Sequence, residues 1–152
     1  MNIKIAIVGG IAFYAAQFLV GMATGSFIHE GILDPLYRVT SEFWRPELNQ
    51  DPPDIARLMP RWIITGLTTS FIMAGIYSIL RTSYSGAAWL KGAKFGLTLA
   101  ILMACWSAAW SGIFNLPEKI WLWWNIESFL YFVIGGSALG WVAEKVAPEN
   151  AE

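Results

Sequence analysis

The chain has 152 residues, of which 56% are hydrophobic and only 14% charged, and its net charge is −1. Ordinary soluble domains carry about 25% charged residues, so the composition argues against a water-soluble domain. The near-zero net charge removes the electrostatic basis for nucleic-acid binding. The single cysteine, Cys105, excludes an intrachain disulfide and a thiolate metal cluster, and we expect it to be an inert packing thiol.

Four apolar runs are each long enough to cross about 30 Å of hydrocarbon at about 1.5 Å per residue. Because backbone polar groups in lipid must be satisfied within the segment, each run is predicted to be a helix. The sequence therefore predicts an all-α fold, a single integral membrane domain over residues 1–152 built as a bundle of four transmembrane helices. The expected spans are residues 5–28, 61–81, 88–113 and 118–143.

The connection between the first two spans, residues 30–59, is long, acidic and rich in proline. Asp34-Pro35 has the pattern of a helix N-cap followed by proline at the first helical position, and Pro46 marks an end. We predict a short amphipathic helix between them that lies on the membrane surface. The alternative is a loop helix that packs on the bundle. One face of this helix would carry Leu36, Tyr37, Thr40, Phe43 and Trp44.

An even number of spans places both termini on one side of the membrane. Lys and Arg are divided equally, five on the terminal side and five on the long-loop side, so the positive-inside rule does not decide the orientation. The long-loop side carries more acids, which favours cytoplasmic termini with the long loop outside. We therefore expect a protein of the bacterial inner membrane with cytoplasmic termini.

Glu127 is the one ionisable side chain well inside an expected span. A charge at that depth costs at least about 2.5–3.5 kcal/mol. No Lys, Arg or His lies within an expected helix core to pair with it. We therefore expect Glu127 to face the bundle interior and to be protonated for much of the time.

Polar residues of the other three spans fall at the same expected depth as Glu127, about 9–16 Å from the long-loop side at about 1.5 Å per residue. They would form a hydrogen-bonded network around Glu127 that either binds a ligand or a proton or only holds the helices together. Asn125 points to nearly the opposite face and needs another partner. The expected members of the network are Gln17, Thr68, Thr69, Trp106 and Ser107.

Two further features suggest ligand binding, each beside a simpler interpretation. His29 lies where the first span ends, and it is either an axial ligand of a haem or chlorophyll-type pigment or an ordinary interfacial histidine. Trp106 and Trp110 lie one helical turn apart and either line a cavity for a flat apolar ligand, such as a quinone or carotenoid, or pack in the core. The sequence carries no catalytic motif and no metal site, and it implies no particular cofactor.

Tryptophan and glycine mark the ends of the spans. The indoles at the start of the second and fourth spans predict an aromatic belt on the long-loop side: Trp62, Trp121, Trp123 and Trp124. Glycine pairs at four-residue spacing let helix backbones approach closely, either within the bundle or against other subunits. These pairs are Gly21 and Gly25, Gly92 and Gly96, and Gly136 and Gly140.

The segment from Gly92 to Trp141 resembles a bacterial family of uncharacterised four-helix membrane proteins. The resemblance rests on a third helix that begins with glycines, a short loop with Pro117, and a fourth helix that is flanked by bulky side chains. That helix carries a polar residue near its start, Asn125, and small residues at 135–140. The resemblance covers about a third of the chain and implies a four-helix architecture without an activity.

Three functions are compatible with these features. We favour an accessory, structural or assembly subunit of a larger membrane complex, in contact with membrane lipids and with other membrane subunits or copies of itself. The alternative is a small oligomeric transporter, or a membrane protein that binds an apolar ligand (lipid, quinone or pigment), centred on Glu127. A membrane enzyme that acts on lipid or quinone has no positive support.

Overall fold

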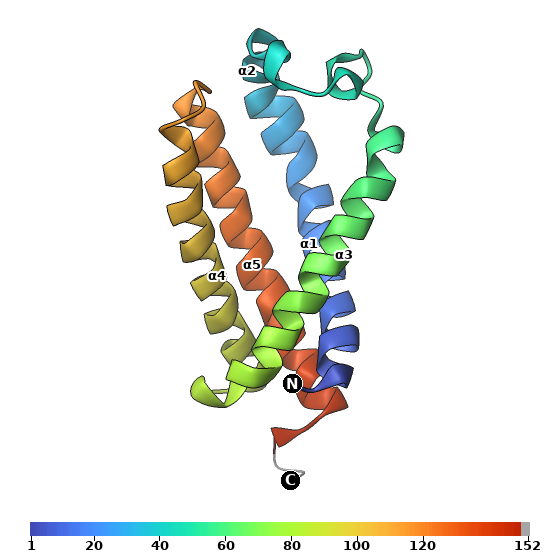
Figure 1. Cartoon of the computed structure of the whole chain (residues 1–152), viewed down its shortest axis with the longest axis vertical. Helices are drawn as coiled ribbons and strands as arrows, with labels where there is room; N and C mark the ends of the chain where they lie inside the picture. Colours follow the sequence, from blue (N-terminus) through green and yellow to red (C-terminus); the bar gives the residue numbers. More distant parts are fainter. Residues whose placement is uncertain (150–152) are drawn as a thin grey trace.

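The structure, a computed structural model, describes residues 1–149, which are helical and contain no strand. Four helices are long and apolar enough to cross a membrane, which confirms the all-helical prediction with four candidate spans (Figure 1). They cover Ile5–Val39, Ile55–Ser83, Ala88–Ser111 and Glu118–Val146.

The first of these helices is one continuous rod that alternates α-helix with wider π-helical segments. Its parts are η1 (Ile5–Gly9), α1 (Gly10–Gly25), η2 (Ser26–Leu33) and α2 (Asp34–Val39). The rod therefore continues well past the expected end at residue 28. Local π turns are one way in which apolar helices re-satisfy backbone groups near a proline.

Helix α2 begins at Asp34 as expected, but the expected N-cap role of Asp34 was wrong, because α2 continues η2 without a break. Leu33 and Asp34 both have right-handed helical backbone angles, so the chain does not leave the helix before Pro35. The Asp34 carboxylate instead accepts a hydrogen bond from the Arg38 guanidinium one turn later, at 2.8 Å. The N-cap pattern was misleading because both residues lie inside a helix that the preceding π segment carries forward.

The chain after α2 packs on the helices, as in the alternative interpretation of the long loop. Two short 3-10 turns follow, η3 (Ser41–Phe43) and η4 (Pro46–Asn49). Trp44 donates its indole N–H to the carbonyl of Tyr37 at 3.0 Å, and its ring lies 6.0 Å from the ring of Trp124. The aromatic residues of the loop thus cover the end of the last helix.

The remaining helices are α3 (Ile55–Leu80), α4 (Ala88–Ser111) and α5 (Glu118–Val146), with a 3-10 turn, η5 (Arg81–Ser83), after α3. Helix α3 begins upstream of the expected start at residue 61, because the Asp54 side chain caps it by accepting from the Arg57 amide at 3.2 Å. Pro60 therefore lies inside the helix and not before it.

Helix α5 is central, with α4 on one side and α1 on the other, and α3 packs against α1 (Figure 1). The backbones of α4 and α5 touch at four glycines. A Cβ atom at Gly92 would collide with the Gly136 carbonyl oxygen, and one at Gly96 with the Phe132 carbonyl oxygen. Two of the three predicted glycine pairs, Gly92 with Gly96 and Gly136 with Gly140, thus serve packing within the chain.

Two hydrophobic clusters hold the helices at opposite ends. All four long helices contribute to the cluster near the termini, formed by Ile5, Phe13, Ala74, Tyr77, Phe95, Leu139 and Ala143. At the long-loop end the buried cluster joins only the first rod and α5, through Ile28, Leu33 and Ile120. Helix α3 diverges from the others towards that end (Figure 1).

Candidate functional site

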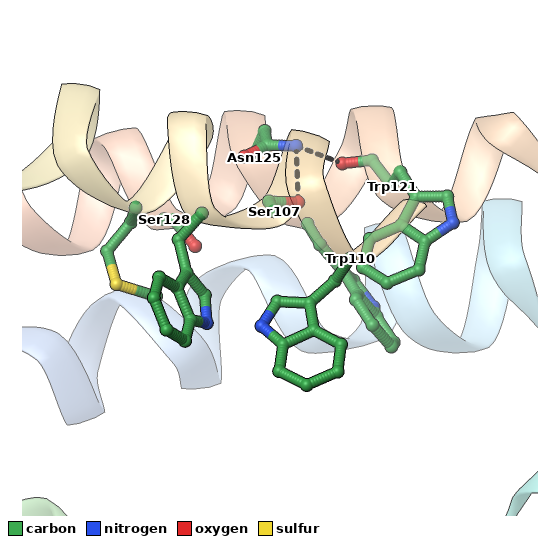
Figure 2. Close-up of a pocket in the computed structure, with 8 residues that line it drawn as sticks. Ser107, Trp110, Trp121, Asn125 and Ser128 are labelled. Atoms are coloured by element: carbon green, nitrogen blue, oxygen red, sulfur yellow. Dashed lines mark hydrogen bonds between the residues drawn. The ribbon is translucent and has the colours of Figure 1, made fainter. Parts of the chain in front are cut away.

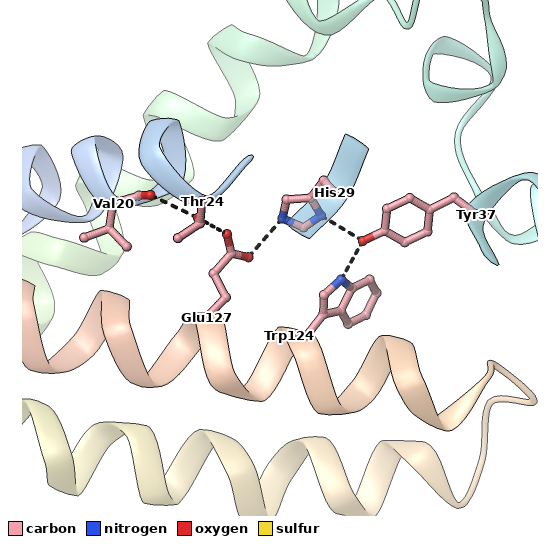
Figure 3. A network of polar contacts seen from close by, with 6 residues as sticks. All are labelled: Val20, Thr24, His29, Tyr37, Trp124 and Glu127. Carbon is pink, nitrogen blue, oxygen red and sulfur yellow. Dashed lines mark hydrogen bonds and ion pairs between the residues drawn. The ribbon is translucent and has the colours of Figure 1, made fainter. Parts of the chain in front are cut away.

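Glu127 lies on α5, is 4% exposed as a whole residue and directs its carboxyl at the first rod. The Thr24 hydroxyl lies 2.5 Å from its Oε1, and His29 Nε2 lies 2.9 Å from its Oε2 (Figure 3). The expectation that Glu127 has no basic partner was therefore wrong. The carboxyl and the imidazole form a pair that can share a proton or carry opposite charges.

A chain of hydrogen bonds continues from His29 towards the long loop (Figure 3). The Trp124 indole donates to the Tyr37 hydroxyl at 2.9 Å, and that hydroxyl lies 2.8 Å from His29 Nδ1. Because an indole N–H can only donate, the Tyr37 oxygen accepts from Trp124 and is free to donate to His29. In a neutral His29, this arrangement leaves the ring proton on Nε2, directed at Glu127.

The π-helical segment η2 explains how Thr24 and His29 both reach Glu127. In a regular α-helix, residues five apart point about 140° away from each other. Segment η2 begins at Ser26, between the two residues, and its wider turns carry His29 back to the face occupied by Thr24. Such π segments are rare and are often found at functional sites.

The site is buried at Glu127 and open at His29. The Glu127 side chain is 6% exposed, whereas the His29 side chain is 37% exposed. The Tyr131 hydroxyl also lies near the Glu127 carboxyl, against Gly21 of the first rod. The hydroxyls of Thr24, Tyr37 and Tyr131 thus surround a single acid–histidine pair that has one accessible end.

The structure places most of the expected network elsewhere. Gln17 and Thr69 line a separate open cleft of about 350 Å³ between α1, α3 and α5. Thr68 is exposed and donates to its own helix, at the Ile64 carbonyl. None of these three residues bonds to Glu127, because that side chain faces the end of the first rod.

Asn125 and Ser107 meet each other, away from Glu127. The Asn125 amide nitrogen donates to Ser107 Oγ at 3.0 Å and to the Trp121 carbonyl at 2.7 Å (Figure 2). Asn125 therefore finds its partner within the chain. Both residues line an open cleft of about 180 Å³ between α4 and α5, which we term the tryptophan cleft. Its indoles are Trp106, Trp110, Trp121 and Trp124.

The other tryptophans and the cysteine occupy varied positions. Trp123 packs edge-on against Phe27, and Trp62 is 43% exposed, as a belt residue would be. The Trp121 N–H is buried and has no hydrogen-bond partner within residues 1–149. Cys105, expected to pack in the interior, is instead exposed on α4.

Sequence reasoning missed Thr24 as a partner of Glu127 and Tyr37 as a partner of His29. The available signal was the apolar residues Ile32, Leu33 and Leu36, which continue the pattern of the first span beyond His29. A helix extended through these residues brings His29 and Tyr37, eight residues apart, onto one face. Among residues 1–149, no group of three or more His, Cys, Asp or Glu side chains is placed to hold a metal ion.

Comparison with protein-family models, with curated proteins and with solved structures finds no match to this chain. The fold and the site define its class: an all-helical chain with four helices that are long and apolar enough to cross a membrane and with a buried Glu–His pair. The resemblance of the segment from Gly92 to Trp141 to four-helix membrane proteins stays a prediction.

Proposed function

We propose that the chain is an integral membrane protein with four crossings, in the bacterial inner membrane and with cytoplasmic termini. In each of the four helices, only 22–33% of the most apolar stretch is buried within the chain. The remaining apolar surface needs a nonpolar environment, and lipid supplies it. The side of the long loop has more acidic residues than the side of the termini and equally many basic ones, so it has the more negative net charge. This difference supports cytoplasmic termini.

Within that membrane, the function favoured by the geometry is that of a small transporter or ligand-binding protein centred on Glu127. The observation that carries this proposal is the pairing of Glu127 with His29 at 2.9 Å. An ionisable residue at membrane depth is expensive and usually marks an ion, proton or substrate site. A second titratable group in contact gives the site a proton donor and a proton acceptor, which a lone carboxyl lacks.

The proposed action of the pair is to take up and release a proton, or to bind a polar group of a small membrane-soluble molecule. His29, the more exposed partner, supplies access from the long-loop side. Thr24 and Tyr37 hold the two members in place from opposite ends of the pair. Burial of the Glu127 carboxyl strengthens its coupling to the imidazole, since charges interact more strongly at low dielectric.

Infrared difference spectroscopy across a pH jump, on the chain in lipid bilayers, tests proton binding directly. We expect the C=O band of a buried protonated carboxyl, at a frequency distinct from that of solvent-exposed acids, when the pair takes up a proton. Glu127→Gln should remove this band and His29→Gln should shift the pH at which it forms. Glu42→Gln, which changes an exposed acid of the loop, should leave it unchanged. A band that persists in Glu127→Gln, or no band in the unmodified chain, would contradict the proposal.

A second candidate function, an accessory or assembly subunit of a larger membrane complex, is favoured by the outward face of α4. This helix packs mainly on α5 and exposes large apolar side chains, among them Ile101, Leu102 and Trp106. Cross-linking through Cys105, which is exposed on the same helix, would test it. A complex predicts a discrete cross-linked product in native membranes that Cys105→Ser abolishes, whereas an unpartnered chain gives none.

A further inference from the structure

The tryptophan cleft shares Trp124 with the hydrogen-bond chain that reaches His29 through Tyr37, but none of its lining residues bonds to Glu127 or His29. It has the features of a second binding site. We propose that it binds the ring of a membrane-soluble molecule of the phenol or quinol class, with the rest of that molecule in the lipid. This inference rests on the proposed membrane crossings but not on the proposed role of the Glu127–His29 pair, because it requires neither Glu127 nor His29.

The size of the cleft selects a single ring. Its volume is about 180 Å³, and an apolar cavity of about 150 Å³ is known to bind benzene. A six-membered ring therefore fits within this volume, whereas a porphyrin or the fused rings of a larger pigment would extend beyond it. The positions of Trp106 and Trp110 in the sequence suggested flat apolar ligands in general, such as a quinone or carotenoid. The volume of the cleft favours molecules with a single ring.

The walls supply ring stacking together with hydrogen bonds. Trp106 and Trp110 lie edge to face with their ring centroids 6.0 Å apart, an arrangement that presents π surface and ring edges to a guest. Figure 2 shows Trp110 and Trp121 projecting from the helices on which Ser107, Asn125 and Ser128 lie. The lining of the cleft thus combines four indoles with the polar side chains of Ser107, Asn125 and Ser128.

The hydrogen bonds of Asn125 indicate what kind of polar group the ring carries. Its amide nitrogen donates to Ser107 and to the Trp121 carbonyl. Both amide protons are therefore used, and the amide oxygen, which can only accept, has no partner within residues 1–149. The Ser128 hydroxyl likewise has none in that range. A ring hydroxyl can donate to Asn125 and accept from Ser128, which a hydrocarbon ring cannot do.

The cleft is reached from the outside of the chain, at the level of the hydrocarbon. Trp106 is 62% exposed and Trp110 is 38% exposed, so the indoles leave an open side. A ring that enters from the bilayer can keep its alkyl tail in lipid. A lipid acyl chain could also enter, but it would use neither the stacking surface nor the unpaired amide oxygen.

The test compares 4-hexylphenol with hexylbenzene, which lacks only the hydroxyl. The chain is reconstituted in lipid nanodiscs, and tryptophan fluorescence is followed at equal concentrations of each compound in the membrane. We expect a saturable change, with the phenol binding about tenfold more tightly, the effect of one hydrogen bond. A change that does not saturate, or equal affinities for the two compounds as an acyl-chain site would give, overturns the proposal.

Three variants localise the binding. Asn125→Leu should reduce the affinity for the phenol to that for hexylbenzene, and Ser128→Phe, which fills the cleft, should abolish binding of both. Trp89→Leu changes an exposed indole outside the cleft and should alter neither affinity. Circular dichroism and gel filtration identify any variant that does not fold. Binding that persists in folded Ser128→Phe contradicts the proposal, whereas binding retained in Glu127→Gln separates it from the proposed function.

Discussion

At the residue scale, the Glu127 carboxyl is held by one bond to Thr24 and one to His29. Hydrogen bonds between membrane helices contribute about 0.6 kcal/mol on average and up to about 1.7 kcal/mol. The Thr24 bond belongs at the upper end of that range, because its acceptor is a buried carboxyl. We expect Thr24→Val to lower the free energy of unfolding by about 1–1.7 kcal/mol, measured by unfolding in mixed micelles.

Thr68→Val is the matched control for this prediction. Thr68 is an exposed threonine of α3 whose hydroxyl bonds only to its own helix, at the Ile64 carbonyl. Its replacement should leave the unfolding free energy nearly unchanged. Equal effects of the two substitutions would mean that the bond between Thr24 and Glu127 contributes nothing specific.

We expect Glu47 to govern the response of the long loop to acid. Its own backbone N–H, together with the Arg45 guanidinium and the charge of Arg57, holds the pKa of the Glu47 carboxyl below its usual range. A lowered pKa means that the folded loop favours the ionised form. This stability is present at neutral pH, above the pKa of the unfolded chain, and is lost as the pH falls through the lower pKa of the folded loop.

Trp44, in the same loop, reports this acid transition by its fluorescence. We expect the folded loop of the unmodified chain to loosen as the pH falls below the usual range of a carboxyl. Glu47→Gln should remove that pH dependence and leave the loop less stable at neutral pH. Glu42→Gln, a change at an exposed neighbour, serves as the control. An unchanged acid transition in Glu47→Gln would show that another group controls the loop.

At the scale of the elements, the contact between α4 and α5 depends on glycine. A Cβ atom at Gly92 would meet the backbone of Gly136 and Gly140, which cannot move aside as a flexible side chain can. Overpacking of this kind costs about 1–3 kcal/mol. Gly92→Ala should therefore lower the unfolding free energy by that amount or force the two helices apart.

Gly25→Ala, on the first rod, is expected to have the opposite effect from Gly92→Ala, because there is room for the added Cβ atom. A Cβ atom there meets nothing within 4 Å. Alanine is favoured over glycine within a helix by about 0.5–1 kcal/mol, so this variant should be as stable as the unmodified chain or slightly more stable. Should both glycine substitutions prove harmless in mixed micelles, close backbone contact between α4 and α5 would be ruled out.

The four helices and the burial of Glu127 could be predicted from the sequence, because hydrocarbon-length apolar runs have few alternatives. The partners of Glu127 could not. The depth count assumed regular α-helix that ended near residue 28, whereas a π segment, η2, rotates His29 towards Glu127 and carries the rod through Val39. A π turn arises from tertiary packing and local backbone hydrogen bonding. Neither can be predicted from the spacing of apolar residues in the sequence.

At the scale of the whole molecule, the helices are joined near the termini and diverge towards the long loop. The cluster near the termini unites all four long helices, whereas the cluster at the loop end omits α3 and α4. The two open clefts, beside Gln17 and beside Asn125, lie where the helices leave apolar surface uncovered. Each cleft needs lipid, a ligand or a partner to fill it.

The account rests on four membrane crossings, which place the Glu127–His29 pair inside the bilayer. Accessibility labelling tests this most directly, with single cysteines placed in a Cys105→Ser chain at Gln50, Ser83 and Asn115, three exposed positions in successive connections. With an impermeant maleimide on sealed vesicles, we expect the cysteines at positions 50 and 115 to react from one side and that at position 83 only from the other. Reaction of all three from the same side would contradict the account.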